Sequence, residues 1–215
     1  GEMKIFVIGA AGNIGTRIRQ EALSRGHQVT GLTRDASRLP KEARLTVVEG
    51  DVMDTAALAA ALTGHDALVV SHGSPPDDPK GGPKTILAAD SIIDAMREAG
   101  LKRVLWVGGA GSLFTQEGKR AFDTIDLPAW ANSGIWAMAA HLAHLKTITD
   151  LDWSFLSPSL LIGPGERTGK FRLGRDELLV DENAESSISY EDYAVAVLDE
   201  LENPQHVRQR FTVGY

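Results

Sequence analysis

Three glycines near the N-terminus have a spacing that suits phosphate chemistry. Gly9, Gly12 and Gly15 follow an apolar run from Lys4 to Ile8, and a helical pattern begins directly after them. Glycines at such a strand-to-helix turn permit a tight bend, and they let the N–H groups at the helix start approach a phosphate. We therefore expect the turn to bind the pyrophosphate of a dinucleotide. The expected contacts are Gly9, Ala11, Gly12, Asn13, Ile14 and Gly15.

The end of the second apolar run indicates which dinucleotide fits. Proteins that prefer NAD usually carry an acidic residue there for the ribose hydroxyls, whereas this chain has Thr33 followed by Arg34. A guanidinium forms charge-assisted bonds to a 2′-phosphate, so the pattern favours NADP, with NAD as the alternative. Arg38 could assist from one turn later or be a solvated surface charge. Asp35 could instead neutralise Arg34 or bind a ribose itself.

The ends of the following strands complete the expected cofactor site. Asp51 closes the third apolar run, where its carboxylate could accept a bond from the adenine amino group or cap a turn. For His72 and Gly73 we expect backbone contacts to the cofactor ribose. The segment 72–84 holds four of the prolines and is expected to be neither helix nor strand, as a functional rim or a plain connection. The remaining expected contacts are Val52, Ser71 and Gly108.

Few residues are candidates for the chemistry itself. Ser112 follows the fifth apolar run and could bond the substrate or the nicotinamide amide, or only cap a polar turn. His141 and His144 lie one helical turn apart and could move a proton, although packed or exposed histidines are the commoner alternative. Because no carboxylate accompanies them, we expect no metal site.

Apolar, β-branched runs alternate with helical patterns almost to the end of the chain, as in βαβ units. Strands are predicted near 4–9, 28–33, 45–50, 67–71, 103–107, 153–157 and 210–213. Helices are predicted over 14–24, 55–61, 84–98, about 133–149 and 190–201. The sequence therefore predicts an α/β fold, a Rossmann-type doubly wound parallel sheet of about seven strands with helices on both faces. We expect one domain over 3–215, with substrate-binding elements mainly in 157–190.

The composition narrows the classes of partner. The 29 acidic side chains outnumber the 22 basic ones, and the net charge of -7 opposes binding to nucleic acid. There is no cysteine, which excludes disulfides and thiolate metal sites, and no apolar run is long enough to span a bilayer. We expect a cytoplasmic monomer or homodimer that acts on a small molecule, with neither nucleic acid nor membrane as a partner. Gly1 and Glu2 resemble a remnant of tag removal.

Several segments together resemble the atypical branch of the short-chain dehydrogenase/reductase superfamily, in particular its NAD(P)H-binding and NADH-flavin reductase proteins. That branch includes the NmrA-like and flavin/biliverdin reductase B proteins. The resemblance rests on the Gly9 turn, Leu32 to Arg34, Glu49 to Asp54, Arg103 to Ser112, Leu151 to Pro158 and Ser187 to Ala194. It implies a catalytic-serine position at Ser112 and a substrate region after the sixth strand. The segment 157–170 is most similar to the NADH-flavin reductases.

The substrate region that the resemblance implies contains Arg167, Lys170, Arg172 and Arg175. These side chains could attract an anionic acceptor such as flavin mononucleotide, or form a solvated hairpin. Trp130 and Trp136 could stack on an isoalloxazine ring or belong to the core.

The chain departs from the superfamily's enzymes in lacking their Tyr-x-x-x-Lys pair. Its tyrosines are Tyr190, Tyr193 and Tyr215, and no lysine stands four residues beyond any of them. Ketone chemistry needs the tyrosine as a proton donor, whereas a reduced flavin anion is delocalised and needs mainly the positioning of two rings. We expect an NADPH-dependent reductase of a flavin, quinone or similar planar acceptor, with the flavin as substrate rather than prosthetic group. The alternative is a non-catalytic NADP-binding redox sensor of the NmrA-like type.

Overall fold

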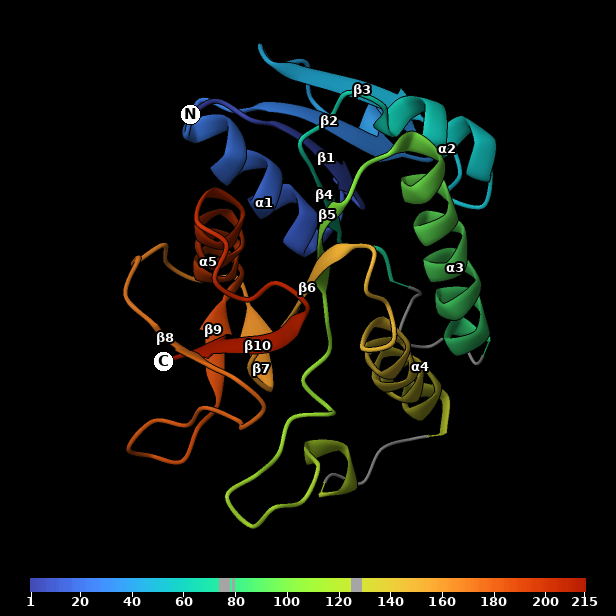
Figure 1. The fold of residues 1–215 in the computed structure, drawn as a ribbon. Coiled ribbons are helices and arrows are strands. Elements are labelled where there is room, and N and C mark those ends of the chain that lie inside the picture. Colours follow the sequence, from blue (N-terminus) through green and yellow to red (C-terminus); the bar gives the residue numbers. More distant parts are fainter. Residues whose placement is uncertain (74–77, 79, 125–128) are drawn as a thin grey trace.

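An eight-stranded sheet forms the centre of the protein, whose computed structural model describes residues 1–73, 78, 80–124 and 129–215 (Figure 1). The strand order is β3-β2-β1-β4-β5-β6-β10-β8, parallel throughout except for β8 at the edge. These strands are β1 (Lys4–Ile8), β2 (Gln28–Thr33), β3 (Leu45–Glu49), β4 (Ala67–Val70), β5 (Arg103–Val107), β6 (Asp152–Ser157), β8 (Arg172–Gly174) and β10 (Gln209–Gly214). A separate parallel pair joins β7 (Leu161–Gly163) to β9 (Ser187–Ser189).

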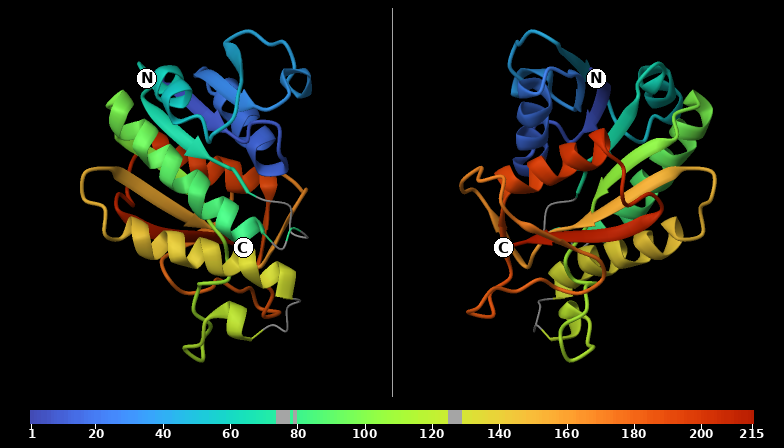
Figure 2. Two further views of the ribbon diagram at one scale, coloured as in Figure 1. Left: turned by 90° about the vertical axis from the view of Figure 1, so that its right-hand side faces the viewer. Right: turned by 60° about the vertical axis from the view of Figure 1, so that its left-hand side comes forward.

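Helices cover both faces of the main sheet, as Figures 1 and 2 show. One face carries α1 (Asn13–Ser24) and α5 (Tyr190–Glu202). The other carries α2 (Thr55–Leu62), α3 (Gly81–Ala99) and α4 (Ala129–Leu145). Among the helices of the described residues, none is both long and apolar enough to cross a membrane.

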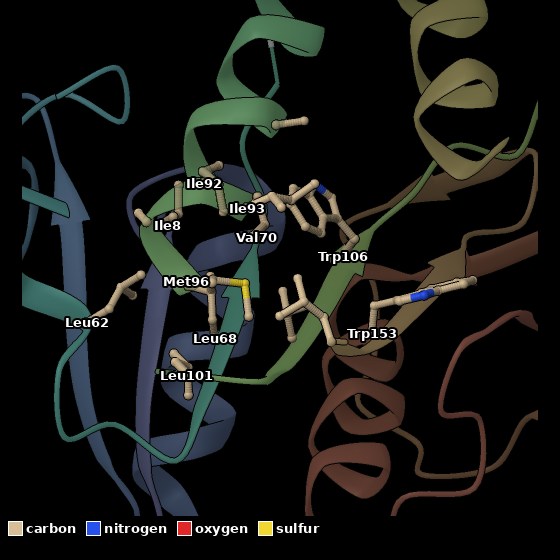
Figure 3. Close-up of a cluster of buried hydrophobic side chains, with 14 of the residues drawn as sticks. Ile8, Leu62, Leu68, Val70, Ile92, Ile93, Met96, Leu101, Trp106 and Trp153 are labelled. Carbon is tan, nitrogen blue, oxygen red and sulfur yellow. The ribbon is translucent and has the colours of Figure 1, made fainter. Parts of the chain in front are cut away.

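Alternation along each strand divides the core into two layers. In β1, Ile5 and Val7 join the cluster beneath α1 and α5, whereas Phe6 and Ile8 join the cluster on the opposite face. Figure 3 shows the second cluster, in which α3 packs on β4, β5 and β6; its labelled members are Ile8, Leu62, Leu68, Val70, Ile92, Ile93, Met96, Leu101, Trp106 and Trp153. The central strands are buried on both faces, which explains why they appear in the sequence as continuous apolar runs.

The predicted doubly wound sheet is confirmed, with corrections at its margins. Strands β7, β8 and β9 were not predicted, because each has only three residues and too little apolar pattern. The prediction that 72–84 contains no helix was wrong at its end, since α3 already begins at Gly81. Pro83 fits there because the first turn of a helix does not use its backbone N–H. Residues 74–77 and 79 lie outside the described residues.

The chain reverses direction across the sheet between β1 and β4. From β1 it winds outward through β2 to β3, and it then returns to lay β4 on the other side of β1. At such a switch point the two flanking connections leave in opposite directions, so a crevice opens beyond the carboxyl ends of the strands. The predicted glycine turn follows β1 at this crevice.

We expect Tyr193→Phe to lower the free energy of unfolding by about 1 kcal/mol, because it removes one buried hydrogen bond. The Tyr193 side chain is fully buried, and its hydroxyl donates to the Leu156 carbonyl oxygen at 2.7 Å. Urea denaturation followed by circular dichroism measures the change. Tyr190→Phe is the control, since Tyr190 begins the same helix and is only partly buried. Equal decreases in the free energy of unfolding for the two substitutions would contradict a stabilising role of the Tyr193 hydrogen bond.

Candidate functional site

Only glycine fits at two positions of the turn between β1 and α1. Gly9 has a φ of +81°, and a Cβ there would stand 2.4 Å from the Ser71 carbonyl oxygen. A Cβ at Gly15 would stand 1.9 Å from the Gly9 carbonyl oxygen, so α1 passes directly over the turn. Gly12 is the N-cap of α1, and no side chain caps that helix end or places an acidic group in its first turn. The helix start is thus open to an external anion.

A cleft of about 240 Å³ opens at this turn. It brings together ten of the predicted cofactor residues: Gly9, Ala11, Gly12, Thr33, Arg34, Arg38, Val52, Ser71, His72 and Gly73. Asn13, Ile14, Gly15, Asp51 and Gly108 do not line it. Ile8, Leu32 and Gly50 line it without having been predicted. All three lie within one residue of the carboxyl end of a strand, and this position in the sequence could have identified them as cleft residues.

The two carboxylates near Arg34 have separate roles. Asp35 caps a 3-10 helix (Ala36–Arg38) and accepts from the Ser37 N–H at 3.0 Å and the Ser37 hydroxyl at 2.6 Å. These bonds lower the pKa of Asp35. Arg34 instead approaches Asp51, with 3.4 Å between Nη2 and Oδ2, and both side chains are largely exposed. An exposed ion pair of this kind is weak, so a dianionic phosphate can compete for the guanidinium.

Asp51 also caps a turn, because its Oδ1 accepts from the Met53 N–H at 2.9 Å. Both of its carboxylate oxygens thus have partners on the chain. His72 also lines the cleft, where burial lowers its pKa; Arg34 adds to this effect and Asp51 opposes it.

The loop after β5 is held between β6 and α4. The Gly108 N–H donates to the Leu156 carbonyl oxygen at 2.9 Å, and a Cβ on Gly108 would stand 2.1 Å from the Phe155 ring. A Cβ on Gly111 would stand 2.6 Å from the Ile135 side chain. Ser112 ends the glycine stretch and is buried, with its hydroxyl accepting from Arg210 Nη1 at 2.9 Å. The structure places Ser112 among buried side chains and not on the wall of the cleft.

The two candidate histidines have different surroundings. His141 is only 2% exposed and lies against Trp106, with ring centroids 4.3 Å apart. Burial lowers its pKa to about 4, and no described group hydrogen-bonds its Nε2. His144 is exposed. Within the described ranges, no group of histidine, aspartate and glutamate side chains could hold a metal ion.

Most of the basic side chains after β6 are engaged within the chain. Arg167 donates to both carboxylate oxygens of Glu21, at 2.7 and 3.0 Å. Arg172 donates to backbone carbonyls, including that of Val180 at 2.6 Å, and Arg175 contacts the Gln209 side chain. These three guanidinium groups stabilise local structure. Trp136 is 53% exposed and its ring lies 4.4 Å from that of Phe122, whereas the side chain of Trp130 lies outside the described residues.

One family model and several known proteins match nearly the whole chain. The chain matches the family described as NAD(P)H-binding over residues 9–204. It is similar to the uncharacterised protein YwnB of Bacillus subtilis, with 39% identity over 98% of both chains. A solved structure from Bacteroides thetaiotaomicron, named a "putative epimerase", is 38% identical over 100% of this chain and 98% of its own, with a TM-score of 0.91. A "putative NADH-flavin reductase" from Streptococcus pneumoniae is 32% identical over 99% of each chain, with a TM-score of 0.86.

Gly12→Ala should weaken nucleotide binding at least about tenfold, which is about 1.4 kcal/mol, while the fold persists. A Cβ at Gly12 would make only an ordinary contact with the Gly9 oxygen at 3.4 Å, but it occupies the backbone approach to the pyrophosphate. Titration calorimetry with NADPH measures the change. Gly64→Ala is the control: its φ of +84° makes alanine strain the turn after α2, away from the cleft, so it should lower stability and leave the Kd unaltered. Unchanged affinity in Gly12→Ala would contradict the site.

His141 should make stability fall in mild acid. Its pKa is about 4 in the fold and 6.5 in the unfolded chain, so the unfolded state binds more protons between these values. Stability is therefore present above pH 6.5 and is lost as the pH falls, by about 2 kcal/mol from pH 7 to pH 5. Urea denaturation of the wild type and of His141→Leu across this range isolates the effect. An identical pH dependence in both proteins would refute it.

Proposed function

Because the chain belongs to the NAD(P)H-binding family, we propose that it is an NADPH-dependent reductase that passes hydride to a flavin, quinone or similar planar acceptor. The observation that carries this proposal is the glycine-lined cleft at the switch point, with Arg34 at one end. Such a cleft supplies nucleotide affinity, and the rest of the carboxyl edge must supply the geometry for hydride transfer. NADPH, when bound, would carry the hydride.

The cofactor half of the proposal rests on Arg34 and Arg38. Both line the cleft beside the end of β2, where the ribose of the adenosine half lies in proteins of this fold. The competing carboxylate of Asp35 is turned to Ser37, which leaves only the weak pair with Asp51. The chain therefore offers a 2′-phosphate the exposed guanidinium groups of Arg34 and Arg38 in place of the acidic residue that usually binds the ribose of NAD.

The acceptor half rests on the apolar groups beyond β5 and β6. When the adenosine half lies at β2 and β3, the nicotinamide lies across β1, toward β4 and β5. Large exposed hydrophobic side chains follow there, namely Leu160 and Leu161 after β6 and Trp136 on α4. Exposed side chains of this kind suit an aromatic, planar acceptor better than a sugar.

The placement of the tyrosines favours an acceptor that needs no phenolic acid. The Tyr193 hydroxyl donates to a backbone carbonyl, and burial raises its pKa well above the usual value. The Tyr215 hydroxyl donates to Asp192 at 2.6 Å, and burial together with this carboxylate raises its pKa. Neither phenol lines the nucleotide cleft, although Tyr215 lines a separate cavity with Leu160 and Leu161, where its hydroxyl is held by Asp192. Reduction of a flavin tolerates this, because the negative charge formed on the ring is delocalised.

A second candidate is a non-catalytic redox sensor that binds NADP. It is favoured by the burial of Ser112 and His141, two of the three predicted catalytic residues, neither of which lines the cleft. A sensor would bind NADP and NADPH with different affinities and change its contacts with a partner. It would not consume NADPH.

NADPH oxidation in the presence of an acceptor separates the two candidates. The purified chain is saturated with NADPH and mixed with flavin mononucleotide or a simple quinone, and the loss of NADPH absorbance is followed. We expect turnover, and at an NADPH concentration below saturation we expect a lower rate in Gly12→Ala because it binds the nucleotide more weakly. A saturated protein that oxidises NADPH with none of a broad acceptor panel would exclude the reductase and leave the sensor.

Arg34→Ala should raise the Kd for NADPH by about tenfold to a hundredfold and leave that for NADH nearly unchanged, because only NADPH has the 2′-phosphate. Asp51→Asn should act in the opposite direction, since it removes the competing carboxylate of Arg34. Arg97→Ala on α3, which breaks an exposed ion pair with Asp150, is the matched control. Parallel changes for both nucleotides would rule out Arg34 as the selective group.

A further inference from the structure

A buried guanidinium lies beneath the glycine loop that follows β5. Arg210 stands in β10 and is 4% exposed. Its Nη1 donates to the hydroxyls of Ser112 at 2.9 Å and of Ser157 at 3.3 Å, and its Nη2 donates to the Ser112 carbonyl oxygen at 3.2 Å. Its Nε donates to Asp176 at 2.9 Å. Every nitrogen of the group is therefore used.

These bonds join three segments that are distant in sequence. Ser112 ends the glycine loop, Ser157 ends β6, and Asp176 follows β8. The segment of Asp176 is itself paired with the loop, because the Phe114 N–H donates to the Asp176 carbonyl oxygen at 2.8 Å. Arg120 adds a second guanidinium bond to the Ser112 carbonyl oxygen at 3.0 Å. Two arginine side chains thus hold the end of the loop at Ser112.

The stability of the fold alone does not explain why the charged Arg210 side chain is buried. Removing a guanidinium from water is costly, and apolar side chains of similar volume often serve a core equally well. The benefit of Arg210 is geometric, since its planar fork fixes several acceptors at once. Asp176 is half exposed and only partly neutralises it.

The loop from Gly108 to Gly111 has few bonds of its own. The described backbone hydrogen bonds of these four residues beyond β5 are Gly108 N–H to the Leu156 oxygen, Leu113 N–H to the Ala110 oxygen and Phe122 N–H to the Gly111 oxygen, and three of the four residues are glycines. Glycine permits many backbone conformations, so the observed one must be fixed at the two ends. β5 fixes the first end. At the second end the Phe122 N–H donates to the Gly111 carbonyl oxygen, and the Arg210 bonds hold the adjacent Ser112.

We propose that Arg210 is a positioning residue, which through Ser112 holds the glycine loop against which nicotinamide and acceptor align. This inference rests on the proposed function and assigns Ser112 to anchoring rather than to a bond with the substrate or the nicotinamide amide. Hydride transfer requires the reacting atoms to lie about 3 to 3.5 Å apart, and a displacement of about 1 Å can cost a hundredfold in rate. Nucleotide affinity arises elsewhere, at the Gly9 turn and Arg34.

Arg210→Lys tests the proposal, because lysine keeps the charge but cannot hold Ser112 and Asp176 together. We expect kcat for NADPH oxidation to fall at least about tenfold while the Kd for NADPH changes less than about twofold. When Ser112 is already replaced by alanine, Arg210→Lys should lower kcat by a several-fold smaller factor, because the two residues act through the same contact. Additive losses would overturn the assignment of Ser112 as the anchor.

Arg103→Lys is the matched control. Arg103 is also an arginine with a largely buried side chain, and it joins β5, β6 and α5 through Asp152, Ser154 and Glu200 at the amino ends of the two strands. It should destabilise the fold to a similar degree and leave kcat unchanged. If Arg210→Lys lowers kcat no more than Arg103→Lys, then Arg210 has no positioning role.

Hydrogen exchange of the free protein provides a readout that does not depend on turnover. Arg210→Lys should speed amide exchange in the peptide 108–113 and leave the peptide 9–15 protected, whereas Arg103→Lys should alter neither. Unchanged exchange at 108–113 would overturn the inference. If the wild type oxidises no NADPH, the proposed reductase fails, and the exchange result still decides whether Arg210 fixes the loop.

Discussion

The close approach of α1 to the Gly9 carbonyl is the constraint on which the rest of the site depends. A Cβ at Gly15 would stand 1.9 Å from that oxygen, and a Cβ at Gly9 would stand 2.4 Å from Ser71 on the neighbouring chain segment. The glycines thus bring the helix start, the end of β1 and the end of β4 into one small space. The positive end of α1 is thereby placed at the crevice that the reversal of strand order opens.

Binding and chemistry are separated along the carboxyl edge of the sheet. The half near β2 holds Arg34, Arg38 and the open helix end, and it has no buried counter-charge that would block a phosphate. Among the described residues, the half near β5 and β6 offers a glycine loop and exposed apolar side chains. An acceptor that needs only alignment suits this division, and it makes the position of the loop the variable that sets the rate.

The sequence predicted what depends on local pattern. The parallel strands have apolar runs long enough to recognise, and the Gly9 turn has a fixed spacing, so both were found with nearly the observed bounds. The partners of Asp35 and Asp51 depend on loop conformation and could not be read from the chain. The position of Ser112 after the fifth strand made it a candidate. Its burial could not be predicted, because the burial depends on contacts with Arg210, almost a hundred residues later in the chain. The one signal for Arg210 was a charged residue inside an apolar strand pattern.

Single-turnover oxidation of NADPH carrying deuterium on one or the other face of the nicotinamide C4 tests the central claim most directly. Direct hydride transfer to a flavin aligned over the bound ring predicts a primary isotope effect for one of the two labelled forms only, at a rate above that in buffer. Equal isotope effects for both forms, or a rate no greater than in buffer, would contradict it.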